Sequence, residues 1–351
     1  MSDPGRNDLT LLDALQRHLQ NRPERVAYRW GARTWTFRQV EEDTNRIANA
    51  LAEQGIGPGD RVACMTRHHV PFLLLALAAM KAGAVCMPVN WRLAPAEAEY
   101  IIAHGCSRLL MVDAAFAAPY LPGGSVALPA DCTVVCTDGA PSGAPAFDAW
   151  HEPHAREFRA VAPQADDSAM QIYTSGTTGL PKGAVLSHRG LLSAVRTVVE
   201  EWHFGADGVL GNPLPTFHVA GVLMLLLTLH TGGTTSAWSD FEPEGFLGSL
   251  AENRVTHAFL VPAMLLFMLQ SPAARTTDFS ALELIAYGGS PVSETLLQQA
   301  MATFQCDFLQ VYGLTEVSGP ATFLSQADHR RAATEPQLLR SAGRPVGQCR
   351  L

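Results

Sequence analysis

The chain has 351 residues, of which 47% are hydrophobic and 17% charged, with a formal net charge of −8. This length allows a large buried core and two or more subdomains. The acidic balance, with Lys and Arg scattered along the chain, argues against a nucleic-acid-binding protein. The longest apolar runs, residues 71–80 and 219–229, predict buried helices, because roughly 20 residues are needed to cross a bilayer.

Two further features bear on the cellular compartment. The first ten residues are polar and acidic and lack the apolar segment of a signal peptide. The seven cysteines stand far apart without a C-x-x-C pair, so neither a zinc site nor a disulfide framework is indicated. A cytoplasmic protein without a transmembrane segment is therefore expected.

The first third of the chain predicts alternating helices and strands. Leucines between positions 11 and 19 follow helical spacing, and Pro23 ends that helix. Residues 25–37 indicate a hairpin that turns at Gly31, and a helix with one apolar face follows until Gly55. The next segments alternate between strand and helix, at residues 61–65, 71–81, 84–89, 94–104 and 108–113. This order is typical of a parallel α/β sheet.

Residues 120–167 are rich in Pro, Gly and Ala and contain one short strand pattern, so they predict a junction between subdomains. Alternation resumes afterwards. Strand or helix patterns then occur at residues 169–173, 183–202, 209–214, 219–229, 234–238, 245–253, 257–261, 282–289 and 307–313. We therefore predict a first α/β subdomain over residues 1–165 and a second over residues 166–330.

The segment YTSGTTGLPKG, residues 173–183, predicts a phosphate-binding loop. Its glycines let successive N–H groups face one point, its hydroxyls add donors, and Lys182 adds a positive charge. A surface linker is the alternative, but the loop lies between two apolar runs. It is not a Walker A loop, because Lys182 stands between Pro181 and Gly183. The predicted phosphate-binding residues are Thr174, Ser175, Gly176, Thr177, Thr178, Gly179 and Lys182.

At these residues the chain resembles the adenylate-forming superfamily, which contains acyl-CoA synthetases, luciferases and the adenylation domains of peptide synthetases. YTSGTTGLPKG is similar to the phosphate-loop signature of that family. Other family-like blocks follow in the expected order from about residue 34 to the last residue: TWTFRQVEEDTNRIANAL, GIGPGDRVACM, MKAGAVCMPVN, LPTFHVAG, AYGGSPVS, QVYGLTE and SAGRPVG. The chain looks most like the fatty-acid–CoA ligases.

The resemblance implies an α/β fold, namely the large N-terminal domain of an adenylate-forming enzyme. That domain has two layered αβα subdomains and a small β-barrel, and residues 331–351 are expected to begin the barrel. The family's mobile C-terminal domain, which carries a catalytic lysine, is expected to be absent from this chain.

The resemblance also implies the chemistry. A carboxylate attacks the α-phosphate of ATP, pyrophosphate leaves, and the acyl group then passes to the thiol of coenzyme A. The substrate is the nucleophile, so positioning and charge neutralisation suffice and no Ser-His-Asp triad is needed. Thr315 is expected to contact the α-phosphate, and Glu316 to hold Mg²⁺, with Thr174 as a second candidate ligand. The adenine side is assigned to Gly288, Gly289, Ser290, Pro291, Tyr312 and Gly313.

His218 distinguishes between substrate classes. In the amino-acid-activating relatives the pair corresponding to Phe217–His218 is Phe-Asp, whose Asp holds the ammonium group, so His218 argues against an amino-acid substrate. An aromatic–His pair is usual in acyl- and aryl-CoA ligases, where the His lies beside the reacting carboxylate. The expected catalytic residues are His218, Thr315, Glu316 and Lys182, and the expected substrate-binding residues are His218, Val219, Gly221, Gly288 and Gly313.

The leading hypothesis is a medium- or long-chain fatty acid–CoA ligase that uses ATP, Mg²⁺ and coenzyme A. Three alternatives stay open: an aryl-carboxylate–CoA ligase, a fatty acyl-AMP ligase, and a catalytically weak fragment that binds nucleotide or acyl groups. The acyl-AMP ligases tend to carry Ala where Thr315 stands. The sequence does not decide the oligomeric state, and a homodimer is also left open.

Overall fold

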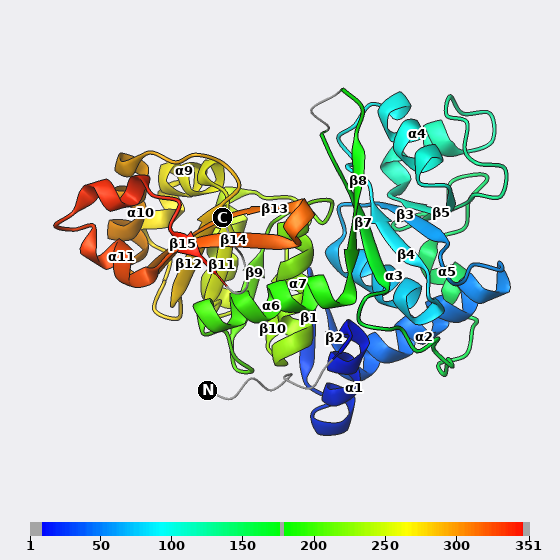
Figure 1. The fold of residues 1–351 in the computed structure, drawn as a ribbon, viewed down its shortest axis with the longest axis horizontal. Helices are drawn as coiled ribbons and strands as arrows, with labels where there is room; N and C mark the ends of the chain where they lie inside the picture. Colours follow the sequence, from blue (N-terminus) through cyan, green and yellow to red (C-terminus); the bar gives the residue numbers. More distant parts are fainter. Residues whose placement is uncertain (1–8, 176–178, 347–351) are drawn as a thin grey trace.

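The computed structural model describes residues 9–175 and 179–346, and its strands form two sheets (Figure 1). The nine-stranded sheet has the order β15-β14-β13-β12-β11-β9-β10-β1-β2, and the six-stranded sheet has the order β6-β5-β3-β4-β7-β8. Most neighbouring strands are parallel, whereas β1/β2, β7/β8, β13/β14 and β14/β15 pair antiparallel. The predicted α/β fold is confirmed.

The elements have the following bounds. The strands are β1 Val26–Trp30, β2 Arg33–Thr36, β3 Arg61–Met65, β4 Val85–Pro88, β5 Ser107–Val112, β6 Thr133–Cys136, β7 Ser168–Thr174, β8 Lys182–Ser187, β9 Val209–Asn212, β10 Thr234–Ala237, β11 His257–Leu260, β12 Leu284–Gly288, β13 Asp307–Leu314, β14 Gly319–Leu324 and β15 Arg344–Pro345. The helices are α1 Leu11–Asn21, α2 Phe37–Glu53, α3 His69–Ala82, α4 Pro95–His104, α5 Phe147–His151, α6 His188–Trp202, α7 Val219–Thr231, α8 Pro243–Glu252, α9 Pro262–Gln270, α10 Glu294–Phe304 and α11 Gln326–Arg331.

Side chains on the nine-stranded sheet alternate between two hydrophobic cores. Ala258 and Leu260 of β11 pack with α8, α9 and α10, whereas Phe259 between them packs with α6 and α7. Successive residues of a strand point to opposite faces, so this sheet is covered by helices on both sides. Its parallel strands β11 and β12 are accordingly buried along their whole length and are mostly apolar, as expected for parallel strands covered on both faces.

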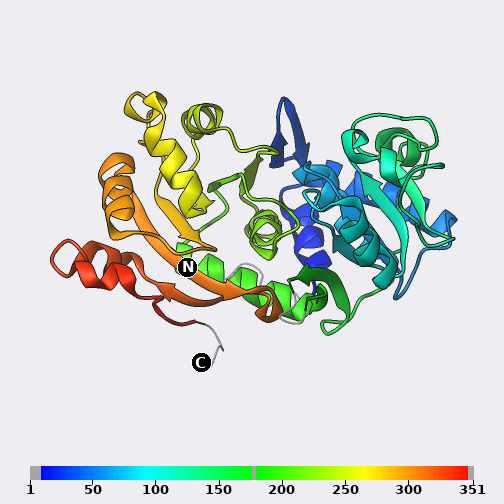
Figure 2. The same cartoon turned by 90° about the horizontal axis from the view of Figure 1, so that it is seen from above.

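The six-stranded sheet shows the same alternation. Ala63 and Met65 of β3 join a core with α4, whereas Val62 and Cys64 face the core that contains α1, α2, α3, α6 and α7. One helix layer therefore lies between the two sheets and serves both, as Figure 2 shows from above. The predicted αβα layers are present, but the two units share their central helices.

Helices α3 and α7 lie in this shared layer, and they are the two longest apolar runs of the sequence. Every residue of α3 is buried, and so is all of α7 beyond its first two residues. A helix that is apolar all round requires burial on every side, and a position between two sheets supplies it. Within the described residues no helix combines the length and the apolar character needed to cross a bilayer.

The two sheets are not contiguous in sequence. Strands β1 and β2 lie in the nine-stranded sheet beside β10, and β7 and β8 lie in the six-stranded sheet beside β4. The division between the two sheets therefore does not fall at the predicted boundary between residues 165 and 166. Strands join the sheet in which their apolar side chains are buried, whatever their order in the sequence. The assignment of residues 331–351 to the start of a β-barrel stays a prediction.

Local signals account for most of the element boundaries. Thr10 and Thr36 cap α1 and α2, each with a reciprocal capping box formed with Asp13 and Gln39. The predicted hairpin turns at Gly31, whose φ is +56°. The five-residue helix α5 inside the Pro/Gly-rich segment was not predicted, because a helix of that length shows no periodicity.

Candidate active site

The predicted phosphate loop connects two antiparallel strands. Thr174 at the end of β7 pairs with Lys182 at the start of β8, and the preceding rung pairs Tyr173 with Gly183. Ser175, Gly179 and Lys182 are exposed to solvent, and Gly179 has φ +100°, a conformation that favours glycine. The predicted loop residues Gly176, Thr177 and Thr178 lie outside the described residues. Thr174 and Lys182 thus lie side by side at the end of the hairpin where the loop connects its two strands.

A direct contact joins this hairpin to the YGLTE segment. The Thr174 hydroxyl donates a hydrogen bond to Glu316 Oε1 across 3.0 Å, although the two residues are 142 positions apart in sequence. Glu316 belongs to a short 3₁₀ turn, Thr315–Val317, which ends at Ser318 with φ +64°. An exposed carboxylate next to a hydroxyl is a donor set that fits a hard, oxygen-preferring cation such as Mg²⁺.

The predicted adenine-side residues lie at the ends of two neighbouring strands. β12 and β13 are parallel, with Gly288 paired to Val311, so Gly289 and Tyr312 follow at the same edge of the sheet. The Tyr312 side chain is 46% exposed, and the ladder is irregular between it and Gly313. Ser290 and Pro291 are exposed in the segment after β12. Such an exposed ring at a strand terminus is available for stacking.

Two of these glycines are required by close backbone approaches. A Cβ atom added to Gly288 would lie 2.2 Å from the carbonyl oxygen of Val311, and one added to Gly313 would lie 2.0 Å from that of Gly319. Backbone atoms cannot withdraw as a flexible side chain can, so both positions exclude any side chain.

We expect the Gly288→Ala variant to be less stable than the unmodified protein by about 1–3 kcal/mol, because the added methyl group forces β12 and β13 apart. Gly248→Ala is the matched control. Gly248 lies within α8, and a Cβ atom added there would have nothing within 4 Å, so alanine should raise stability by about 0.5–1 kcal/mol. Urea unfolding of both variants gives the comparison, and equal stabilities would contradict the close approach at Gly288.

His218 stands at the N-cap of α7, directly after the loop that follows β9. Its side chain is open to solvent on one side, and the Phe217 ring lies 4.5 Å away between centroids. Partial burial, together with the positive charge of Arg92, lowers the pKa of His218 below its ordinary value. The lowered pKa favours the neutral imidazole near pH 7.

Two of the expected substrate-binding residues follow His218 in α7: Val219 is half-buried and Gly221 is buried. A Cβ atom on Gly221 would lie 2.2 Å from the carbonyl oxygen of Pro215. Within the described residues no hydrogen bond or ion pair joins His218 to Thr174 or Glu316. The structure therefore brings the phosphate hairpin and Glu316 together, while His218 forms a separate part of the candidate site.

Sequence reasoning missed an aromatic and cationic cluster around His218. The Trp91 ring stacks on Phe116 at 5.7 Å and meets Phe217 edge-on at 6.3 Å. The Arg92 guanidinium lies 4.6 Å over Trp91 and 5.6 Å over Phe217. Each of these residues follows the carboxyl end of a parallel strand, which is where open α/β sheets bind their ligands. Their position directly after predicted strands was the signal in the sequence that could have identified them.

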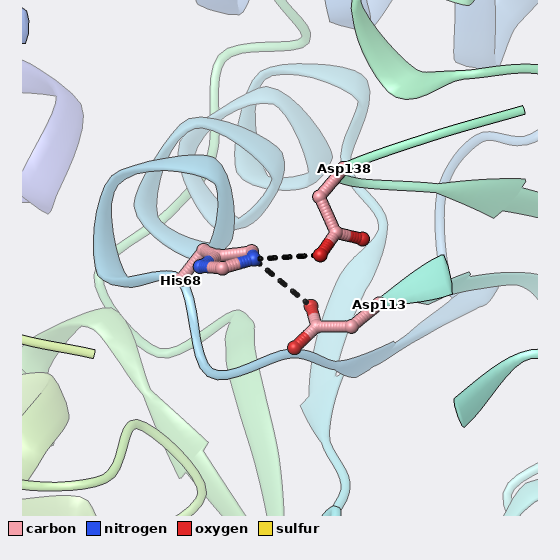
Figure 3. A group of neighbouring side chains, drawn as sticks. All are labelled: His68, Asp113 and Asp138. Atoms are coloured by element: carbon pink, nitrogen blue, oxygen red, sulfur yellow. Dashed lines mark hydrogen bonds and ion pairs between the residues drawn. The ribbon is translucent and has the colours of Figure 1, made fainter. Parts of the chain in front are cut away.

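A second group with metal-ligand chemistry lies nearby (Figure 3). The ligand atoms of His68, Asp113 and Asp138 are all within 4.8 Å of one another. Asp113 is fully buried, however, and it already binds Arg67 Nε at 3.2 Å and the Thr137 hydroxyl at 2.7 Å. The arginine neutralises the carboxylate and occupies the space of a cation, so this group is explained by its protein contacts alone.

This group connects the two sheets. His68, after β3, approaches Asp113 and Asp138 at the ends of β5 and β6, and its other ring nitrogen lies 3.3 Å from Ser239 after β10. Arg67 also pairs with Asp240 at 3.2 Å. Strand ends from both sheets thus meet in one hydrogen-bonded network beneath the aromatic cluster.

A cavity of about 580 Å³ lies elsewhere, between the outer edge of β6 and residues 120–128. None of the predicted site residues lines it. Pocket size therefore does not locate the candidate site, which is instead defined by the contact between Thr174 and Glu316 and by the strand ends around His218.

Comparison with known proteins shows the family of this chain. The model of the AMP-binding enzyme family matches residues 15–351. The chain belongs to this family. Two relatives of this chain are a fatty acid–[acyl-carrier-protein] ligase, ScoC, of Streptomyces coeruleorubidus and an indoleacetate–CoA ligase of Aromatoleum aromaticum. They are 34% and 31% identical over 96% and 98% of the chain.

The chain spans 63% and 66% of the length of these two relatives. Among solved structures, it matches the inhibitor-bound N-terminal domain of FACL13 from Mycobacterium tuberculosis with a TM-score of 0.86 and 30% identity, covering 96% of this chain and 82% of that one. The chain thus has the fold of an N-terminal domain of an acyl-activating, adenylate-forming enzyme. The roles of its individual site residues stay predictions.

Proposed function

We propose that this chain activates a carboxylic acid with ATP, forming an acyl-adenylate and pyrophosphate, and that the acyl group is then transferred to the thiol of coenzyme A. The observation that carries this proposal is the hydrogen bond of 3.0 Å between Thr174 and Glu316. It unites a phosphate-type hairpin with a carboxylate suited to Mg²⁺, which is the pairing that nucleotide chemistry requires.

Each part of the site has a distinct task in this proposal. Thr174, Ser175 and Lys182 hold the β- and γ-phosphates, and Thr315 contacts the α-phosphate. Glu316 and Thr174 hold Mg²⁺, which neutralises phosphate charge when it is bound. The carboxylate substrate attacks the α-phosphorus and pyrophosphate departs, so no protein nucleophile is consumed.

The adenine and the acyl group occupy opposite sides of this centre. In the proposal, the adenine stacks on Tyr312 against the backbone of Gly288 and Gly289. His218 orients the substrate carboxylate, and a neutral imidazole, favoured by its lowered pKa, does so without forming a salt bridge that would weaken the nucleophile. Val219 and Gly221 begin the slot for the acyl group.

A medium- or long-chain fatty acid is the proposed substrate. The apolar start of α7 behind His218 supports it, and a fatty-acid ligase is among the relatives. An aryl carboxylate is the second candidate, favoured by the rings of Trp91, Phe116 and Phe217 and by the indoleacetate relative. The first relative transfers to an acyl carrier protein, so coenzyme A is the proposed thiol and a carrier protein the alternative.

Calorimetric binding of non-hydrolysable acyl-sulfamoyl-adenosines to the 351-residue chain tests this proposal, because it requires no turnover. Benzoyl, octanoyl, dodecanoyl and aminoacyl forms are compared. Each buried methylene contributes about 0.8 kcal/mol, so dodecanoyl should bind more tightly than octanoyl. The aminoacyl form should bind weakly, since imidazole replaces the carboxylate that an ammonium group needs.

The other outcomes separate the alternatives. A preference for benzoyl would favour the aryl-carboxylate ligase. Binding without carboxylate-dependent exchange of pyrophosphate into ATP would indicate a catalytically weak binding fragment. If coenzyme A is not acylated although adenylate forms, an acyl-AMP ligase or transfer to a carrier protein is favoured, and adding a carrier protein separates the two. If a folded chain binds none of the four compounds, the proposed function is wrong.

A further inference from the structure

Tyr173, the residue before Thr174 in β7, is held by a side chain from a different element. Its hydroxyl lies 2.7 Å from Nδ1 of His104, at the end of α4, and the two rings meet edge-on at 5.8 Å. The same hydroxyl lies 3.2 Å from Nε2 of Gln171 on β7. Tyr173 also forms the backbone rung next to Thr174 and Lys182. Its side chain is therefore anchored directly under the hairpin.

These contacts form one hydrogen-bond chain with a defined direction. Arg61 on β3 donates from Nε to Gln171 Oε1 at 3.2 Å, and a guanidinium can only donate. The amide nitrogen of Gln171 must then face Tyr173 and donate to its oxygen. The Tyr173 O–H proton remains free to be donated to His104, so Nδ1 of His104 carries the lone pair and Nε2 the proton.

Two further observations show that the chain is tightly fitted. Gln171 is only 6% exposed, and a Cβ atom on Gly183 would lie 2.4 Å from its amide nitrogen, so its side chain crosses directly beneath both hairpin strands. Burial raises the pKa of the Tyr173 hydroxyl, which therefore stays protonated as a donor. His104 in turn stacks on Tyr100 at 5.4 Å, one turn earlier in α4.

We propose that His104 is a positioning residue for the phosphate loop. His104 accepts a hydrogen bond from the Tyr173 hydroxyl and so fixes the last rungs of the β7–β8 hairpin. Thr174 and Lys182 are thereby held in place against the phosphates of a bound nucleotide. This inference rests on the proposed function. In this inference a residue outside the predicted phosphate loop, His104 of α4, holds the hairpin in its conformation.

Binding of ATP with Mg²⁺ and of dodecanoyl-sulfamoyl-adenosine to the same variants tests the inference, because only ATP carries β- and γ-phosphates. Tyr173→Phe and His104→Phe should each weaken ATP binding by about 3- to 10-fold, the effect of one lost hydrogen bond. Both should leave the affinity for the sulfamoyl compound unchanged. The double variant should bind ATP no more weakly than Tyr173→Phe alone, because Tyr173→Phe already removes the hydrogen bond to His104.

Two controls make the test specific. His104→Gln, which supplies a side-chain oxygen as acceptor, should restore part of the ATP affinity. Tyr100→Phe removes a neighbouring hydroxyl of the same helix, for which no hydrogen bond is found among the described residues, and should bind ATP normally. If His104→Phe fails to fold, the nearly isosteric Tyr173→Phe still decides the question.

The failures are distinguishable. Normal ATP binding by both variants, additive losses, or an equal loss for both compounds would overturn the role of His104 while leaving the proposed function intact. An unmodified chain that binds neither compound would overturn both.

Discussion

Replacing Glu316 with Gln should lower the rate of carboxylate-dependent exchange of pyrophosphate into ATP by on the order of 10²–10³-fold. The amide oxygen can still accept the hydrogen bond from Thr174, which now spans 3.0 Å, so the local geometry is retained. What is lost is the negative charge. A neutral amide is a weaker ligand for Mg²⁺ than a carboxylate, and the phosphate charge is then less well neutralised.

The same variant should lose most of the Mg²⁺ dependence of ATP binding, which calorimetry measures even if turnover is slow. Glu24→Gln is the matched control, since Glu24 is an exposed carboxylate that pairs with Arg38 on the surface, and its exchange rate and Mg²⁺ dependence should be normal. An unchanged Mg²⁺ dependence in Glu316→Gln would remove this residue from the proposed metal site.

The protein should lose stability as the pH falls from about 6.5 toward 4, chiefly through two buried histidines. His69, at the start of α3, is fully buried and donates from Nε2 to the Leu214 carbonyl at 2.7 Å. Burial lowers its pKa to about 4. His18 stacks on Phe37 at 4.5 Å, and burial, with the charge of Arg17, lowers its pKa to about 4 as well.

The sign follows from proton uptake. An unfolded histidine has a pKa near 6.5, so between pH 6.5 and 4 the unfolded chain binds protons that the folded chain does not. The stabilisation is complete above pH 6.5 and is lost as the pH falls toward 4. A difference of this size corresponds to roughly 3 kcal/mol for each histidine at the acid end.

Urea unfolding at pH 7.5, 5.5 and 4.5 measures this loss, and variants isolate one group. His69→Gln keeps an N–H donor near Leu214 but does not titrate, so its stability should fall less steeply with acid, even if it starts lower. His203→Asn is the control, because His203 is exposed with φ +57°, which Asn tolerates. A slope in His69→Gln equal to that of the unmodified protein would show that His69 is not the titrating group.

Local patterns predicted most of the elements of this fold. Periodicity and turn residues predicted helices α3 and α7, the hairpin around Gly31 and the strands on either side of the phosphate loop. Their signals are local, because a side-chain period and a glycine turn depend only on neighbouring residues. Helices α9, α10 and α11, the strand β14 and the short helix α5 were not predicted.

The candidate site was predictable only in part. The glycine- and hydroxyl-rich loop, Glu316 and His218 were found because their neighbours form recognisable motifs. Trp91, Arg92 and Phe116 were missed, since each is an ordinary loop residue until the strand ends bring them around His218. His104 was missed for the same reason, because its contact with Tyr173 joins residues 69 positions apart.

The sequence by itself determined the elements, the family and the residue types available for nucleotide chemistry. Only the tertiary structure decided which residues meet. It placed β1 beside β10 and β7 beside β4, set one helix layer between two sheets, and brought Thr174 within 3.0 Å of Glu316. The physical reason is that distant segments pair in order to bury their apolar faces against one another. A local stretch of sequence shows that it has an apolar face, but not which distant segment will cover that face.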